Sequence, residues 1–70
     1  MDYKDRMKKE YTELKDRYTK LRKMLAKYDA GKLDFNPDCP IGLLHRQKSA
    51  MDEYLECLEI RAEYEDIELE

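Results

Sequence analysis

Apolar residues recur along the first half of the chain at alternating intervals of four and three residues. The positions are Met7, Tyr11, Leu14, Tyr18, Leu21, Leu25 and Tyr28. This spacing is a heptad seam, which predicts an amphipathic helix that packs against another helix. The stretch ends at Gly31, which can adopt the left-handed conformation that terminates a helix. We therefore expect a first helix from about residue 2 to about residue 30.

A short connector, residues 31–39, separates this helix from a second helical segment. Proline suits the first turn of a helix, and the residue before a proline avoids the helical region. Asp38 or Cys39 should therefore cap a second helix that runs from about residue 40 to about residue 66. We expect Phe35 to close the hairpin end, and residues 67–70 to fray or to pack as a tail.

The second segment carries a seam of its own, with a flanking stripe that is also mostly apolar. The seam is Leu44, Gln47, Met51, Tyr54, Leu58 and Arg61, and the stripe is Leu43, Ala50, Leu55, Cys57 and Ala62. An antiparallel hairpin pairs positions whose numbers sum to about 72. The expected pairs are Tyr28 with Leu44, Leu25 with Gln47, Leu21 with Met51, Tyr18 with Tyr54, Leu14 with Leu58, and Tyr11 with Arg61.

Because this apolar arc is wider than one helix partner needs, the second helix can contact something else as well. The simplest additional partner is a second copy of the chain. At 70 residues the chain is near the length at which a lone hydrophobic core becomes marginal, and this also favours self-association. The predicted fold class is all-α: residues 1–70 form one antiparallel two-helix hairpin that dimerises into a four-helix bundle or a higher oligomer.

Charge supports the antiparallel arrangement. Residues 1–32 hold 11 Lys and Arg against 6 Asp and Glu, whereas residues 33–70 hold 3 against 11. The basic start of the chain would then lie beside its acidic end. A basic first half could also bind nucleic acid, but acidic residues interrupt the basic ones, which favours a solvated, partner-facing helix. No apolar run is long enough to cross a membrane, so we expect a soluble, cytosolic protein.

Three polar residues, Gln47, Tyr54 and Arg61, occupy predicted seam positions where aliphatic side chains would be more stabilising. An unpaired buried amide or guanidinium costs about 1–3 kcal/mol or more, so each of the three needs a partner. The protein could supply these partners: Arg61 over the ring of Tyr11, Tyr54 stacked on Tyr18, and Gln47 fixing the register. Alternatively, a ligand completes the hydrogen bonds.

The chemistry in the sequence favours binding over catalysis. Tyrosine dominates the aromatic residues, with six against one Phe, and a tyrosine at a helix interface can belong to the core or stack on a base. His45 has no recognisable nucleophile and acidic partner, and it is expected on the surface. Two distant cysteines and one histidine do not make a metal site. The two cysteines are expected to stay reduced. We therefore expect no enzyme activity, no metal and no cofactor.

The second segment resembles a family of short helical phage proteins first catalogued through an open reading frame of crAss-like phages. Its pattern, L-L-x-x-Q-x-x-A-M-x-x-Y-x-x-x-L-x-x-R, falls on Leu43, Leu44, Gln47, Ala50, Met51, Tyr54, Leu58 and Arg61. The match covers about a third of the chain, and it includes the three polar seam residues. The resemblance implies a phage protein in the cytoplasm of an infected bacterium. Some small helical phage proteins of this kind bind a nucleotide immune signal, such as a cyclic ADP-ribose isomer, without cleaving it.

The resulting hypothesis is an anti-defence protein that sequesters a small cyclic nucleotide at an oligomer interface. Tyr11, Tyr18 and Tyr54 would stack on the ligand, Gln47 would recognise a polar edge, and phosphate would be neutralised by Arg46 and Arg61. An alternative is a helical inhibitor or adaptor that acts through protein–protein contacts. A third possibility, direct nucleic-acid binding by the first helix, is least favoured because the second helix is acidic.

Overall fold

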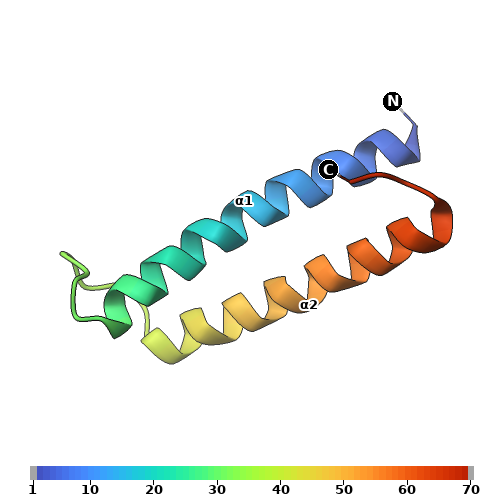
Figure 1. Ribbon diagram of the computed structural model, residues 1–70. Coiled ribbons are helices and arrows are strands. Elements are labelled where there is room, and N and C mark those ends of the chain that lie inside the picture. Colours follow the sequence, from blue (N-terminus) through green and yellow to red (C-terminus); the bar gives the residue numbers. More distant parts are fainter. Residues whose placement is uncertain (1, 70) are drawn as a thin grey trace.

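The computed structural model describes residues 2–69, and in this range the chain forms an antiparallel hairpin of two long helices. Helix α1 spans Tyr3–Asp29 and helix α2 spans Ile41–Glu65. Figure 1 shows them side by side, joined by a loop at one end, with the C-terminal tail returning toward α1 at the other. The molecule is elongated, at 42 × 18 × 18 Å. The all-helical hairpin is thus confirmed, while self-association stays a prediction.

Both ends of α1 follow from local chemistry. At the start, a side-chain oxygen of Asp2 accepts a hydrogen bond of 2.9 Å from the backbone N–H of Asp5, which satisfies a donor that the helix itself leaves unpaired. At the end, Gly31 adopts a φ of 72°, and the N–H of Lys32 donates to the carbonyl of Lys27 at 2.8 Å. This is the glycine-terminated helix end expected from the sequence.

The loop and the start of α2 differ from expectation. Helix α2 begins at Ile41 after Pro40, which has no side-chain capping hydrogen bond, so neither Asp38 nor Cys39 caps the helix. Phe35 is 54% exposed and does not close the hairpin end. Pro40 itself occupies the capping position, with φ −58° and an extended ψ of 138°, so the helix begins one residue later than predicted.

Helix α2 ends in a turn that sends the tail back over the core. Asp66 lies in the left-handed region, with φ 54°, and the N–H of Ile67 donates to the carbonyl of Ala62 at 2.9 Å. The reversed chain buries Ile67, and Leu69 packs against the same cluster. Of the two predicted outcomes for this segment, the packed tail is therefore the one that the structure shows for residues 67–69.

The predicted seam of α1 faces the core for most of its length. Met7, Tyr11 and Leu25 are buried, and the seam residues between them are at least half-buried. Tyr28, the last member, is 42% exposed because the helices end just beyond it. The 4,3 spacing of α1 therefore identified the packed face correctly.

The predicted seam of α2 is wrong at every second position. Seven residues of α2 form the side that packs on α1, and none of them is exposed. We call them the inner seam: Ile41, Leu44, Lys48, Met51, Leu55, Leu58 and Ala62. Gln47, Tyr54 and Arg61 are instead exposed. Of the residues that follow them, Leu55 and Ala62 are buried and Lys48 is half-buried. One residue is a rotation of about 100° on a helix, so the predicted seam combined members of two different faces. The three polar residues are not buried and need no buried partner.

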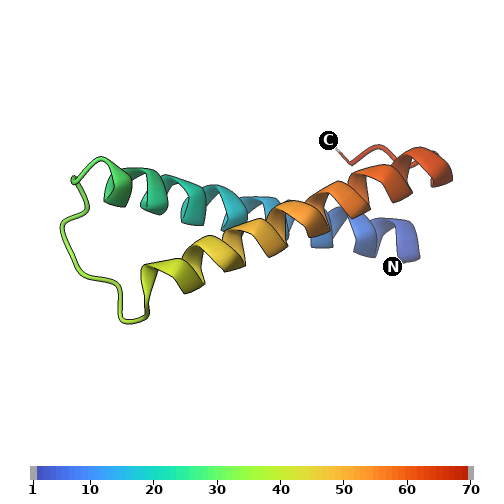
Figure 2. The same ribbon diagram turned by 90° about the horizontal axis from the view of Figure 1, so that it is seen from below.

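The helices are antiparallel, and Figure 2 shows them crossing near the middle of the hairpin. Their register is close to the prediction where His45 approaches Asp29 and where Tyr11 bonds Glu59, but Tyr54 bonds Glu10, eight residues from its predicted neighbour Tyr18. Tyr11 Oη donates a hydrogen bond of 2.8 Å to a carboxylate oxygen of Glu59, two residues from its expected neighbour Arg61. The cation over the Tyr11 ring is Lys15, with its Nζ 5.5 Å from the ring centroid. Arg61 pairs instead with Glu65 of its own helix, at 3.5 Å.

Candidate functional site

The structure divides the six predicted site residues into a core pair and a surface group. Tyr11 is only 3% exposed, and Tyr18 is partly buried against the same core cluster. The other four residues are exposed on α2: Arg46, Gln47, Tyr54 and Arg61. The two tyrosines of α1 therefore shape the hairpin, and the exposed residues of α2 are the ones that a ligand can reach.

Gln47, Tyr54 and Arg61 form a line along one flank of α2, because a spacing of seven residues returns to nearly the same side of a helix. Arg61 lies close enough to Tyr54 for its charge to act on the Tyr54 hydroxyl. The three residues therefore share one side of α2, but the prediction that this line lies in the seam facing α1 is wrong, because all three residues are exposed.

Tyr54 closes a groove between the two helices, which we call the Tyr54 groove. It encloses about 420 Å³ and is lined by Arg6, Lys9, Glu10, Glu13, Leu14, Arg17 and Tyr54. Three of these side chains are cationic and two are anionic, so the groove carries a small net positive charge. Leu14 provides an apolar base beneath the charged side chains.

The Tyr54 side chain is held in this groove by a hydrogen bond. Its hydroxyl donates to a carboxylate oxygen of Glu10, across the helix interface. This bond favours the protonated hydroxyl, so it raises the pKa of Tyr54 above its ordinary value, while the Arg61 charge acts in the opposite direction. Tyr54 as a residue is 45% exposed, so a ligand can reach its side chain.

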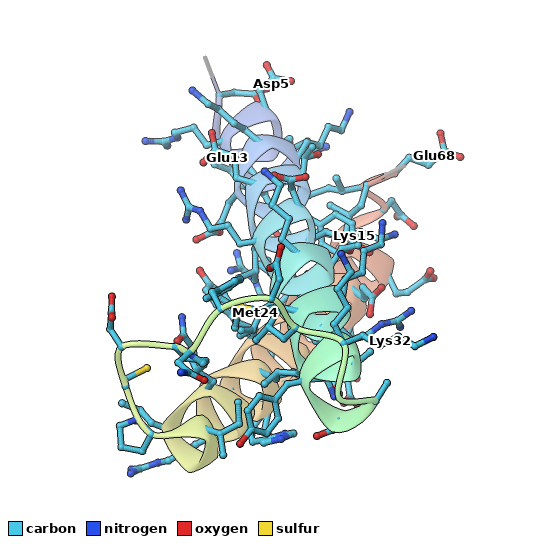
Figure 3. All side chains as sticks on the ribbon, turned by 90° about the vertical axis from the view of Figure 1, so that its left-hand side faces the viewer. Asp5, Glu13, Lys15, Met24, Lys32 and Glu68 are labelled. Atoms are coloured by element: carbon cyan, nitrogen blue, oxygen red, sulfur yellow. The ribbon has the colours of Figure 1, made fainter. Side chains whose placement is uncertain are left out.

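The opposite flank of the hairpin carries a different surface. A groove of about 330 Å³ is lined there by Tyr11, Thr12, Lys15, Asp16, Thr19 and Leu69. Figure 3, viewed from the loop end, shows Glu13 and Lys15 pointing to opposite sides of α1. Tyr11 and Tyr54 thus line grooves on opposite flanks of the hairpin, and the structure does not bring these two predicted stacking residues together.

A third groove, at the loop end, was missed by the sequence analysis. It encloses about 390 Å³ and is lined by Lys20, Lys23, Met24, Lys27, Lys32, Leu33, Asp34 and Phe35. We call it the lysine groove, because four cations there face one carboxylate. The signal was present: Lys20, Lys23 and Lys27 follow helical spacings of three and four, and the exposed Phe35 folds beside them. Only the fold shows that the loop joins this cationic face.

The remaining candidate groups lie outside these grooves. His45 is exposed as expected, with its Nε2 3.9 Å from an Oδ of Asp29, and the two form an ion pair only when the imidazole is protonated. Cys39 and Cys57 are free thiols. Within residues 2–69, no group of three His, Cys, Asp or Glu side chains could hold a metal ion. Neither described helix has an apolar stretch long enough to cross a bilayer.

The fold and its surface define a small two-helix protein with two grooves in which cationic side chains outnumber carboxylates. The chain matches the family model described as Sequestin over residues 1–64, and it belongs to the Sequestin family. The family name refers to sequestration and indicates a binding role rather than a catalytic one. No curated protein matches the chain, and neither does any solved structure. The expected link to crAss-like phages stays a prediction.

Proposed function

We propose that this protein binds a small nucleotide signal, such as a cyclic ADP-ribose isomer, and sequesters it intact at an oligomer interface. In this proposal it is a phage protein that withholds the signal from a bacterial defence system. The observation that carries the proposal is the Tyr54 groove, where a partly exposed tyrosine lies among three cations. None of these polar groups is needed in the hydrophobic core.

Each part of a nucleotide has a suitable group in or beside this groove. The Tyr54 side chain can stack on adenine, an interaction worth about 1–3 kcal/mol per base. Arg6 and Arg17 can form paired hydrogen bonds with phosphate oxygens. Glu10 and Glu13 can accept hydrogen bonds from ribose hydroxyls, which distinguishes a nucleotide from inorganic phosphate.

The polar line extends this proposed site along α2. Gln47 would recognise a polar base edge, with Arg46 and Arg61 providing further positive charge for phosphate. Tyr11 and Tyr18 pack in and against the core of the hairpin. In this proposal they do not touch the ligand; they hold the helices that form the groove. The family name, which refers to sequestration, supports retention of the ligand without cleavage.

Calorimetric titration of the purified protein with adenine-containing cyclic nucleotides, including cyclic ADP-ribose isomers, tests the proposal. We expect saturable binding by at least one member of the panel. The double variant Arg6→Ala/Arg17→Ala should weaken binding by roughly tenfold to a hundredfold, because each lost charge-assisted pair contributes about 1.5–3 kcal/mol before solvent exposure reduces it. Absence of heat across the panel, with a helical circular dichroism spectrum, would refute nucleotide sequestration.

Lys23→Ala/Lys27→Ala is the matched control, because it removes the same number of charges from the lysine groove. It should leave the affinity within about threefold of the native protein, an effect expected from long-range electrostatics alone. If this variant loses binding and the arginine variant keeps it, sequestration stands and the ligand occupies the lysine groove. A host protein captured in place of any nucleotide would instead support the protein-binding alternative.

A further inference from the structure

A second heptad seam runs along the exposed side of α2. Its members, which we call the outer seam, are Leu43, Gln47, Ala50, Tyr54, Cys57, Arg61 and Tyr64. They recur at intervals of 4, 3, 4, 3, 4 and 3, and all seven are exposed. Leu43 is 51% exposed and Tyr64 is 86% exposed. Two heptad seams on one helix are typical of a helix with helical neighbours on two sides. Helix α1 packs on the inner seam, and its hydrogen bond to the outer seam is the one between Glu10 and the Tyr54 hydroxyl.

The outer seam is self-complementary when it meets its own copy in an antiparallel direction. Pairing positions whose numbers sum to 107 or 108 opposes large residues with large and small with small. The opposed pairs are Leu43 with Tyr64, Gln47 with Arg61, Ala50 with Cys57, and Tyr54 with itself. Each apolar or small residue meets another, and the amide of Gln47 meets a guanidinium to which its oxygen can accept a hydrogen bond. This is the symmetry of an isologous two-fold interface.

Charge selects the antiparallel direction over the parallel one. Residues 41–51 of α2 hold Arg46 and Lys48 and no acidic residue, whereas residues 52–65 hold six acidic residues against Arg61 alone. Antiparallel packing places the basic start of each α2 beside the acidic end of the other. Parallel packing would place the acidic ends together, and like charges across a helix interface are destabilising.

We propose that the outer seam of α2 is the interface with a second copy of this chain, antiparallel and with a two-fold axis at Tyr54. The inference rests on the self-association in the proposed function, and it deepens that function. Because Tyr54 is at the axis and also lines the Tyr54 groove, the two grooves of the dimer adjoin. Arg6 and Arg17 of both subunits then border one composite site. A single hairpin contributes only half of the residues of this site.

Disulfide trapping without any nucleotide tests this register. In a Cys39→Ser background, Ala50→Cys places a new thiol opposite Cys57 of the partner subunit at two symmetric positions. Oxidation should give a covalent dimer on a non-reducing gel. Ser49→Cys is the matched control, because it introduces a thiol on the same helix one residue outside the seam. We expect at least roughly tenfold more covalent dimer from Ala50→Cys, since only a pair within disulfide reach cross-links readily.

The parent Cys39→Ser protein separates the two directions. In the proposed register the two Cys57 residues are offset by seven positions, about 10 Å along the helices, which is beyond disulfide reach. The parent should therefore stay uncross-linked, and a Cys57 dimer in the parent would overturn the antiparallel register. Should Ala50→Cys disturb folding, Tyr54→Cys in a background without other cysteines should cross-link to itself at the axis.

Light scattering on the native protein separates failure of the interface from failure of the proposed function. If the native protein is a dimer but neither Ala50→Cys nor Tyr54→Cys cross-links, this interface is overturned and self-association still stands. A monomer at every concentration tested would overturn the interface and the oligomeric part of the proposed function together. Nucleotide binding is measured separately by calorimetry, so a dimer with the proposed register that binds no nucleotide would refute sequestration alone.

Discussion

Tyr11 is the residue at which the structure and the sequence-based hypothesis differ most clearly, because stacking on a ligand requires an open ring. Its side chain is 3% exposed, and its hydroxyl donates to Glu59. A buried aromatic ring contributes to stability through its area and packing, and truncation to alanine typically costs about 3–5 kcal/mol. At about 0.05–0.15 kcal/mol per residue, the whole hairpin has only about 4–10 kcal/mol to lose.

Tyr11→Ala should therefore remove between about a third and all of the free energy of unfolding. Tyr11→Phe keeps the ring and removes the hydrogen bond to Glu59, so its cost should be about 0.5–1.5 kcal/mol. For a domain of this size, that corresponds to a fall in Tm of roughly 2–12 °C. Urea and thermal unfolding followed by circular dichroism at 222 nm measures both changes. Protein concentration must be held constant, because self-association would shift the midpoint.

Tyr3→Ala is the matched control, since Tyr3 belongs to the same helix and is 49% exposed. Its effect should stay within about 0.5 kcal/mol, as expected for a surface substitution. Equal unfolding midpoints for the Tyr11 and Tyr3 alanine variants would refute the placement of Tyr11 in the core. In the nucleotide titration, Tyr11→Phe should bind as the native protein does. A tenfold loss of affinity at unchanged stability would make Tyr11 a ligand contact after all.

Two further measurements probe the backbone and the groove. Gly31→Ala should lower the free energy of unfolding by about 1 kcal/mol, because φ is 72° there; Gly42→Ala, at a helical position with open space around the added methyl, should raise it by about 0.5 kcal/mol. Denaturant unfolding checks the pair, and a shift of the same sign in both would contradict the two backbone assignments. The raised pKa of Tyr54 predicts that its hydroxyl ionises at higher pH in the folded chain than in the unfolded chain, so its stabilising effect is complete below pH about 10 and is lost as pH rises through the folded pKa. Absorbance at 295 nm, as the difference between native protein and Tyr54→Phe, reports this ionisation, and Glu10→Gln should bring the pKa back toward its ordinary value.

The sequence was sufficient wherever a local requirement or a single periodicity decides the structure. Gly31 could be identified as the end of α1 because few other residues accept a positive φ. The α1 seam could be identified because that helix has one apolar face. The lysine groove could not be identified from the sequence, because it exists only where the loop folds Phe35 back beside the lysines of α1. The register came within two residues at Tyr11, where Glu59 takes the place of Arg61.

The position of Gln47, Tyr54 and Arg61 could not be decided by periodicity, because each member of the outer seam up to Arg61 directly precedes a member of the inner seam. A period of 3.5 residues fits both faces equally, and the choice between them depends on which face fills the space beside α1 with more apolar volume. Leu55 and Ala62 fill that space better than their polar neighbours do.

This change of face also changes what the polar line implies for function. In the core, three polar side chains would have been a cost that only a partner could offset. On the outer seam they are exposed in the single hairpin, where Tyr54 bonds Glu10 and Arg61 pairs with Glu65, so they carry no burial cost until something covers them. A seam that alternates polar residues with small or apolar ones suits a reversible contact, because polar positions in a helix interface fix the register while lowering its stability. A nucleotide bound beside Tyr54 would then contribute hydrogen bonds and charge to an interface that the two hairpins alone hold only weakly.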